Sequence, residues 1–301
     1  MKPVKVLRLF KNDYVIDDLN SEELDVVGYK YNEVIHDRQG NVLEEIRYTS
    51  GGEVEERTVN RYDGNGFLTE EWYYAGDEEP AEHKTYERDE KGRVLREIKH
   101  YLDGSQDITS YTYDEQGHLL EKQMMNSDDE LEGKEIYTFH DGKLVHYRVL
   151  NEDEGLLSEK EIAYDEAGRI TSATERYPDD FHRARIVEVF DGEGRRSQTL
   201  RYNGHEQLVE KVTYIWADGE HVGQIVEETP YGVTTSHYTY DEEGYLTLQE
   251  SFDRGNNLVA RVERTYGDDH QLIESRVFID GQGRGISQNY DIKYEYEYFE
   301  D

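Results

Sequence analysis

The chain has 301 residues, of which 35% are hydrophobic, 26 are tyrosine and none is cysteine. Its 69 acidic residues outnumber its 34 Lys and Arg residues and give a formal net charge of -35, which repels nucleic acid and anionic membrane surfaces. The composition therefore predicts no direct nucleic-acid binding, no disulfide framework and no thiolate site, and it supplies too few aliphatic residues for a deep globular interior.

The N-terminal segment, residues 1–26, is predicted to be a capping unit of the fold. Its short apolar stretch soon meets Lys11, Asn12 and Asp13, so it is too short and too charged for a signal peptide. No stretch approaches the roughly 18 apolar residues that a membrane span needs. We therefore expect no membrane insertion and a cytoplasmic protein, or a surface or secreted one if a leader has been removed.

One turn signature recurs along the chain. An aromatic or β-branched strand is followed by Asp, two polar residues, Gly, a polar residue and an aliphatic one, most clearly in Tyr113–Leu119, Tyr164–Ile170 and Tyr240–Leu246. This spacing predicts a single continuous array over residues 1–301, with about ten repeat units of 25–26 residues. The marker glycines are Gly40, Gly66, Gly92, Gly117, Gly142, Gly168, Gly194, Gly219 and Gly244.

A second, looser set of turns lies halfway between these glycines, for example at Ser50–Gly52, Asp103–Gly104, Asn203–Gly204 and Thr229–Gly232. Each unit therefore contains two strands of roughly nine residues. Asp-x-x-Gly suits a type I turn in which Asp bonds the backbone and Gly takes the left-handed conformation next to a bulge. The unit is predicted to be an antiparallel β-hairpin.

The predicted fold class is all-β, with tandem antiparallel hairpins in one long sheet. Some twenty strands at about 4.8 Å would extend nearly 100 Å, and open sheets of more than about ten strands tend to curl or split. We expect a curled or superhelical sheet, and the alternative is a β-solenoid. Residues 286–301 alternate Ile292, Tyr294 and Tyr296 with charged residues and are predicted to form the closing strand.

The Tyr-Asp-x-x-Gly-x-Leu core of Tyr113–Leu119 resembles the YD repeat of the RHS family. The resemblance covers nearly the whole chain, but only at a few positions in each unit. It implies tandem strand pairs in a curved or spiralling sheet. The period is longer than is usual in the family, and the chain shows no recognisable self-cleaving core, so the resemblance does not extend to enclosing a toxin.

The sequence shows no catalytic signature. Its Gly-rich turns lack the strand-loop-helix setting and the Lys-Ser or Lys-Thr of a P-loop. There is no Gly-x-Ser-x-Gly elbow, no His-Glu-x-x-His pair, and no acidic turn with the ligand order of an EF-hand. We therefore predict no enzyme, no cofactor and no metal site.

Aromatic side chains on a sheet can grip a peptide or a glycan, although cross-strand packing is their ordinary role. We expect a non-catalytic binding or scaffold protein that presents an acidic, Tyr-rich sheet to a macromolecular partner, and the charge favours a basic protein. The alternatives are an immunity protein or antitoxin that neutralises a basic toxin, and a carbohydrate-active or carbohydrate-binding protein. The candidate binding residues are Trp72, Tyr111, Tyr113, Tyr164, Trp216, Tyr238 and Tyr240.

Overall fold

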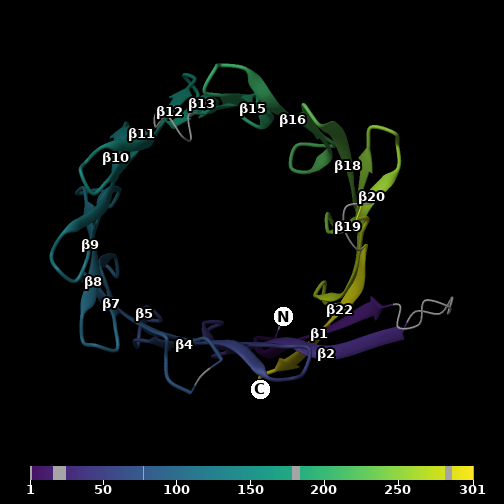
Figure 1. Cartoon of the computed structure of the whole chain (residues 1–301), viewed down its shortest axis with the longest axis horizontal. Helices are drawn as coiled ribbons and strands as arrows, with labels where there is room; N and C mark the ends of the chain where they lie inside the picture. The colour runs from purple at the N-terminus through teal and green to yellow at the C-terminus, as the bar shows by residue number, and fades with distance from the viewer. Residues whose placement is uncertain (1, 16–24, 77, 178–183, 282–286, 301) are drawn as a thin grey trace. The chain divides into compact units, whose positions relative to one another are not determined.

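The computed structural model describes residues 2–15, 25–76, 78–177, 184–281 and 287–300. Parts of the predicted capping unit (1 and 16–24) and of the predicted closing strand (286 and 301) lie outside these residues. The described chain is all-β, and Figure 1 shows its strands in order. They are β1 (Val4–Val15), β2 (Asp25–His36), β3 (Val42–Tyr48), β4 (Val54–Tyr62), β5 (Leu68–Tyr74), β6 (Glu82–Arg88), β7 (Val94–His100), β8 (Gln106–Tyr113), β9 (Leu119–Met125), β10 (Leu131–His140), β11 (Lys143–Asn151), β12 (Leu156–Tyr164), β13 (Ile170–Tyr177), β14 (Ala184–Phe190), β15 (Arg196–Asn203), β16 (Leu208–Trp216), β17 (Val222–Thr229), β18 (Gly232–Tyr240), β19 (Leu246–Asp253), β20 (Leu258–Tyr266), β21 (Leu272–Ile279) and β22 (Gln288–Tyr298).

The repeated turn has the predicted geometry, as the turn between β8 and β9 shows. The backbone N–H of Gly117 donates to the Asp114 carbonyl at 3.1 Å, and the N–H of Asp114 donates to the His118 carbonyl at 3.0 Å. The Asp114 carboxylate accepts the His118 N–H at 2.8 Å, and Gly117 has a φ of 95°. The strand register shifts beside the turn, at Thr112/Tyr113. The prediction of a type I turn with a left-handed Gly and a bulge is confirmed here.

Two of the nine marker glycines depart from the prediction. Gly219 is not among the glycines with positive φ, although Ala217 and His221 close that turn by a backbone hydrogen bond of 2.9 Å. Gly142 does have positive φ, but it sits in a tighter turn in which His140 pairs directly with Lys143. The sequence spacing therefore locates these two turns correctly but assigns them the wrong turn chemistry.

The second set of turns uses the same backbone geometry without requiring Gly. In the turn between β11 and β12, the N–H of Glu154 donates to the Asn151 carbonyl at 3.0 Å, and Glu154 has a φ of 57°. A left-handed conformation costs a non-Gly residue roughly 1 to 2 kcal/mol. The rest of the turn maintains that conformation in the folded chain. The same position is occupied by Asp129, Glu206 and Asn256 in other turns of this set, and by His270 in the marker turn between β20 and β21.

The chain divides into two compact units. The first unit comprises Met1–Thr85 and Ser236–Asp301, and the second unit comprises Tyr86–Thr235. Both have a thin interior, since the described residues contain only four buried hydrophobic side chains. The prediction that the chain lacks a deep core is confirmed. The four are Val6, Ile98, Leu150 and Ala173.

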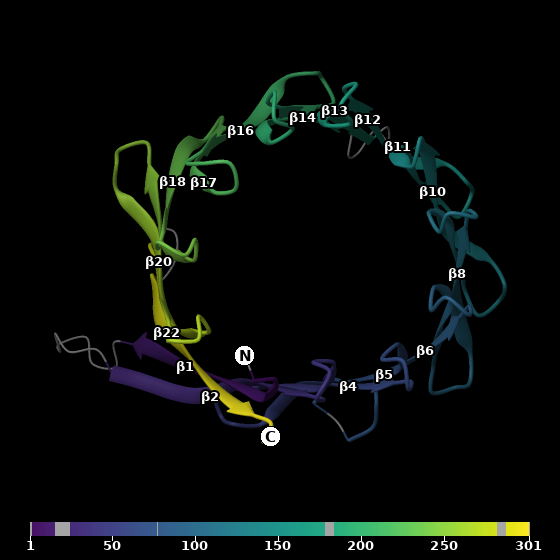
Figure 2. The ribbon, with the colours of Figure 1, turned by 180° about the vertical axis from the view of Figure 1, so that it is seen from behind.

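In the first unit, β1 lies between β2 and β22 and pairs antiparallel with both. Arg8 of β1 joins its two neighbours: its Nε lies 2.6 Å from Glu33 of β2, and its Nη2 lies 3.3 Å from Glu297 of β22. The N–H of Phe299 donates to the Pro3 carbonyl at 3.1 Å. The two ends of the chain therefore lie side by side (Figures 1 and 2).

The β1–β22 pairing contains a buried polar contact. The Asp291 side chain of β22 is only 3% exposed. Its two carboxylate oxygens accept hydrogen bonds from Asn12 Nδ2 at 2.7 Å and from the Tyr14 hydroxyl at 2.5 Å, both from β1. A buried carboxylate must be satisfied by donors to avoid a large desolvation cost, so this contact favours one register between the first and last strands.

The predictions of an open curled or superhelical sheet and of a β-solenoid are wrong. The 22 strands belong to one sheet, and the antiparallel pairing of its first and last strands, β1 and β22, closes that sheet. The repeat specifies each hairpin and its neighbour, whereas closure depends on a pairing between the first and last strands, which no single repeat contains. Closure also removes the two long unpaired edges that an open sheet would expose.

Candidate functional site

The aromatic residue before several of the marker turns ties its hairpin to the preceding one. The hydroxyls of Tyr113 and Tyr164 donate to the carbonyls of Val94 and Leu144 at 2.9 and 2.8 Å. Trp216 uses its indole N–H in the same way, toward the Arg196 carbonyl at 2.9 Å. The polar ends of three predicted binding residues are thus engaged within the sheet. Equivalent bonds join Tyr62 to Val42, Tyr266 to Leu246 and Tyr296 to Leu272.

We expect Tyr164→Phe to lower the free energy of unfolding by roughly 0.5 to 1.5 kcal/mol, because it removes one hydrogen bond and keeps the ring. Urea denaturation measures the change. Tyr231→Phe is the matched control, since Tyr231 is 99% exposed and its hydroxyl supports no packing. Equal denaturation midpoints for the two variants would show that the Tyr164 bond does not stabilise the hairpin.

The other predicted residues are also engaged within the chain. The Trp72 ring stacks on His83 with a centroid separation of 4.8 Å, and the Arg61 guanidinium lies 4.4 Å above it. The Tyr111 hydroxyl donates to Glu97 at 3.3 Å. Burial and the neighbouring Glu97 charge raise the pKa of Tyr111 to about 12. Tyr238 and Tyr240 lie on β18 and also make interactions.

The structure does not bring the seven predicted residues into one cluster. Trp72, Tyr238 and Tyr240 belong to the first unit, and the other four belong to the second. Within the second unit they occupy β8, β12 and β16, which are four strands apart, or about 19 Å at each step. Their regular spacing reflects the repeat.

A carboxylate-tyrosine cluster in the second unit was not predicted. Glu135 accepts the hydroxyls of Tyr137 and Tyr147 at 2.6 and 3.0 Å, and its other oxygen lies 2.9 Å from Lys122 Nζ. Burial and the bond to Glu135 raise the pKa of Tyr137 and bring that of Tyr147 to about 12. The cluster joins residues of β9, β10 and β11, and these residues become neighbours only through the register of the three strands.

The raised tyrosine pKa values predict a loss of stability in alkaline solution. An unfolded tyrosine releases its proton near pH 10, whereas Tyr111, Tyr147 and Tyr177 keep theirs to about pH 12 when folded. Between these values the folded state binds more protons, so the free energy of unfolding falls as the pH rises through this window and is unaffected below it. Urea midpoints and tyrosinate absorbance measured together test this. Titration of all tyrosines near pH 10 would contradict it.

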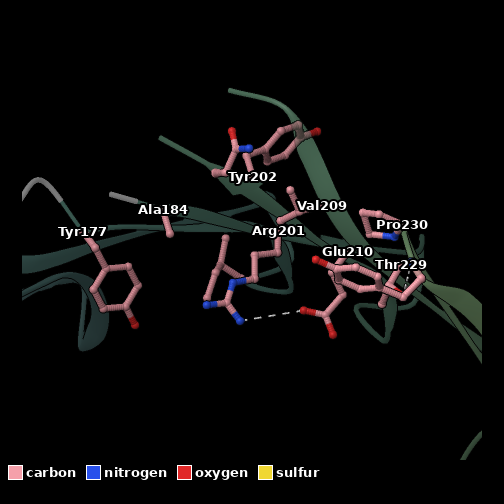
Figure 3. A pocket seen from close by; sticks show the side chains of 11 residues that line it. Tyr177, Ala184, Arg201, Tyr202, Val209, Glu210, Thr229 and Pro230 are labelled. Atoms are coloured by element: carbon pink, nitrogen blue, oxygen red, sulfur yellow. Dashed lines mark hydrogen bonds and ion pairs between the residues drawn. The ribbon is translucent and has the colours of Figure 1, made fainter. Parts of the chain in front are cut away.

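A groove of about 880 Å³ lies on the sheet of the second unit (Figure 3). It crosses β13 to β17 and ends at the turn before β18. We call it the aromatic groove. None of the seven predicted binding residues lines it. Its lining residues are Tyr177, Ala184, Ile186, Arg201, Tyr202, Asn203, Val209, Glu210, Thr229, Pro230 and Tyr231.

Strand register places the central residues of the aromatic groove on one face. Ile186 pairs with Glu175 on one side and with Arg201 on the other, and Arg201 pairs with Glu210. Directly paired residues point to the same face of a sheet, and Figure 3 shows Arg201 and Glu210 extending to the same side. Ile186 therefore lies within a row of charged residues, directly between Glu175 and Arg201.

The two charged residues that line the aromatic groove, Arg201 and Glu210, are only loosely paired, and further charged residues lie beside it. Arg201 Nη1 lies 3.9 Å from Glu210 Oε2, which leaves most of the guanidinium donors available. Glu175 accepts the Tyr177 hydroxyl at 2.7 Å, and this bond, with burial, raises the pKa of Tyr177 to about 12. Lys160 pairs with Glu175 in the strand register, but its ammonium lies 3.7 Å from Glu188.

One end of the aromatic groove is formed by the turn between β17 and β18. The N–H of Tyr231 donates to Thr229 Oγ1 at 3.2 Å, and that hydroxyl donates to the Gly232 carbonyl at 3.3 Å. The turn presents Pro230 and a Tyr231 side chain that is 99% exposed. The sequence signal that could have identified it is Pro-Tyr in a turn where other repeats carry Asp or Asn.

Within the described residues, no group of three or more His, Asp and Glu side chains is arranged to hold a metal ion. His146 Nε2 lies 3.5 Å from Glu159, and His140, at the tip of a hairpin, lies 3.5 Å from Asp141. No helix in the described part of the chain combines the length and apolar character needed to cross a membrane.

The sequence matches no protein-family model and no curated protein. Among solved structures, the chain is similar to a chain of the TcdB2-TccC3-Cdc42 complex, with 14% identity over 91% of this chain and 17% of that one and a TM-score of 0.39. It is also similar to a porin-like protein from Bacteroides uniformis, with 12% identity over 98% and 97% of the two chains and a TM-score of 0.32. TcdB2-TccC3 without its hypervariable C-terminal region gives 12% identity over 88% and 19%, with a TM-score of 0.25. The chain therefore spans less than a fifth of each toxin-complex chain.

Proposed function

We propose that the protein is a non-catalytic binding protein that holds a macromolecular partner, a basic protein, on its acidic, Tyr-rich sheet. The contact lies in the aromatic groove of the second unit. The observation that carries the proposal is the Tyr231 side chain, 99% exposed at one end of a groove of about 880 Å³.

A fully exposed tyrosine beside a groove has the properties of an interface anchor. Aromatic residues contribute large contact areas and are enriched among the residues that dominate binding energy. The volume falls within the range of ligand-binding clefts. At the opposite end, the bond to Glu175 fixes the Tyr177 ring, so little side-chain entropy is lost there when a partner binds.

The net charge favours a basic partner. A formal charge of -35 attracts cationic proteins and raises their association rate, and salt reduces this effect as the Debye length shortens. We therefore expect the association rate constant to fall steeply between about 50 and 500 mM salt, while the dissociation rate constant changes much less.

The test is capture of the partner followed by measurement of its affinity. The full chain, Tyr231→Ala and Leu102→Ala are immobilised in parallel, and proteins retained by the full chain are identified and then titrated as purified partners. Leu102 is 80% exposed on another turn of the second unit, so its variant controls for loss of any exposed apolar side chain. The identity of the partner also separates a scaffold from a toxin neutraliser.

We expect Tyr231→Ala to weaken binding by about thirtyfold, the effect of an anchor residue, and Leu102→Ala to leave the affinity unchanged. A purified partner that binds the full chain and Tyr231→Ala with equal affinity contradicts the groove as the contact. Absence of any saturable protein partner contradicts the binding function.

A further inference from the structure

We propose that the aromatic groove binds a proline-rich segment in the polyproline II conformation, with a basic residue near its centre. The inference rests on the proposed function and names the chemistry of the partner segment. It follows from the hydrogen-bonding state of the strands below the groove, from the length of the groove, and from the side chains at its centre and ends.

The strands beneath the aromatic groove offer no backbone ladder to a ligand. β14, β15 and β16 each pair on both sides with a neighbouring strand. An added β-strand needs the free N–H and carbonyl groups of a sheet edge, which the centre of this sheet does not supply. A polyproline II segment makes no internal or ladder hydrogen bonds and keeps its backbone solvated, so it can lie on the face of the sheet.

The length of the aromatic groove suits about seven residues of such a segment. From β13, which carries Tyr177, to β17, which leads to Tyr231, there are four strand spacings, or about 19 Å. At about 3.1 Å per residue, the first and seventh residues of a polyproline II segment lie about 19 Å apart. With three residues per turn, the first, fourth and seventh residues also share one face.

The side chains at the two ends of the aromatic groove suit the face of the segment that carries its first and seventh residues. Tyr177 lies at one end of the aromatic groove and Pro230 with Tyr231 at the other, where proline rings of the first and seventh residues would pack, as aromatic-lined grooves bind proline-rich segments. Arg201, exposed and only loosely paired with Glu210, can donate to the free carbonyls of the segment.

The charged side chains in and beside the aromatic groove favour a basic fourth residue in the segment. The cross-strand row of Glu175, Ile186, Arg201 and Glu210 carries two carboxylates and one guanidinium; Glu210 and Arg201 line the aromatic groove, and Glu175 lies beside its Tyr177 end on β13. Arg201 lies near Glu210, whereas Glu175 accepts only a neutral hydroxyl among the side-chain contacts of the described residues. The fourth position lies over β15, two strand spacings or about 10 Å from β13, so a long basic side chain there can extend toward the Glu175 carboxylate at the Tyr177 end.

The test uses a fluorescein-labelled peptide of six prolines around a central arginine, titrated with the full chain and followed by anisotropy. We expect saturable binding with a Kd on the order of 10 to 100 μM. Tyr231→Ala should weaken it at least tenfold, and Leu102→Ala should not change it. Glu175→Gln should weaken binding of the arginine peptide but not of an all-proline peptide, a difference that a merely structural defect would not produce.

Two comparison ligands and the captured partner decide the outcome. A glycine-serine peptide with one arginine, which has the charge but not the conformation, should bind at least tenfold more weakly. Equal binding of this peptide, or binding of a neutral oligosaccharide such as maltohexaose in place of the proline peptide, overturns the inference. If no proline peptide binds while a captured protein partner still requires Tyr231, the inference fails and the proposed function stands.

Discussion

Proline at either Ile292 or Lys293 is expected to lower the free energy of unfolding by about 3 kcal/mol, since proline within a sheet removes a ladder hydrogen bond and clashes with its neighbours. Ile292 pairs with Lys11 of β1 and Ser275 of β21, and Lys293 pairs with Phe10 and Glu274. Successive backbone N–H groups point to opposite sides of a strand. One substitution therefore removes a hydrogen bond toward β1 and the other removes one toward β21. Both variants lose a hydrogen bond only if β22 is paired on both sides.

The control is Gln288→Pro at the first residue of β22, which pairs with Ile279 of β21 and lies outside the described β1 register. Proline is tolerated at the start of a strand, so this variant should change the urea midpoint little. If β22 were an edge strand, one of the two central variants would be as stable as the control. That pattern would contradict pairing of β22 with β1.

Valine at Gly66 is expected to destabilise the protein by roughly 1 to 2 kcal/mol, because a β-branched residue resists the left-handed conformation. Gly66 has a φ of 84°, and the nearest atom to an added Cβ is the end of the flexible Gln39 side chain, at 3.2 Å. The cost is therefore chiefly one of backbone conformation. Chemical denaturation followed by circular dichroism measures it.

Gly64 in the same turn is the matched control for Gly66. It lacks the left-handed φ, and nothing lies within 4 Å of an added Cβ, so Gly64→Val should be nearly neutral. The same argument predicts a cost at Gly117, which has a φ of 95° and no neighbour closer than Arg93 Nη1 at 3.6 Å. Equal effects at Gly64 and Gly66 would show that the turn is misassigned.

The local fold was predictable because turn chemistry is local. Asp114 and Gly117 define a turn through contacts within five residues, and their recurrence gives the hairpin length directly. The second set of turns was harder to recognise because Glu154 and Glu206 occupy left-handed positions where sequence reasoning expects Gly or Asn. Their conformation depends on the surrounding hydrogen bonds rather than on residue preference.

Closure of the sheet was not predictable from the repeat. The β1–β22 contact joins residues separated by nearly the whole chain, and the alternation of Ile292, Tyr294 and Tyr296 is equally typical of an edge strand with one apolar face. The contacts that distinguish the two arrangements are Asn12 and Tyr14 with Asp291. No sequence pattern connects these residues.

The candidate site was missed for a related reason. Sequence reasoning selected aromatic residues that recur with the repeat, and recurrence marks a structural role, as Tyr113 and Tyr164 show. Tyr231 breaks the pattern of its turn, and Tyr177 and Ile186 become neighbours of one groove only through the register of β13 and β14. Departures from a repeat are therefore better indicators of a binding surface than its most regular residues.

Disulfide trapping of the first and last strands tests the closed sheet most directly, since the chain has no native cysteine. The pairs Arg8→Cys with Glu295→Cys and Leu9→Cys with Tyr294→Cys are adjacent in the β1–β22 register and cover both kinds of antiparallel pair. Glu45→Cys with Thr58→Cys, within the β3–β4 hairpin, is the positive control. We predict near-complete intramolecular cross-linking of at least one β1–β22 pair under mild oxidation, detected by mass spectrometry of the linked peptides. An open sheet would hold these strands up to about 100 Å apart, so cross-linking of the control without either β1–β22 pair would contradict closure.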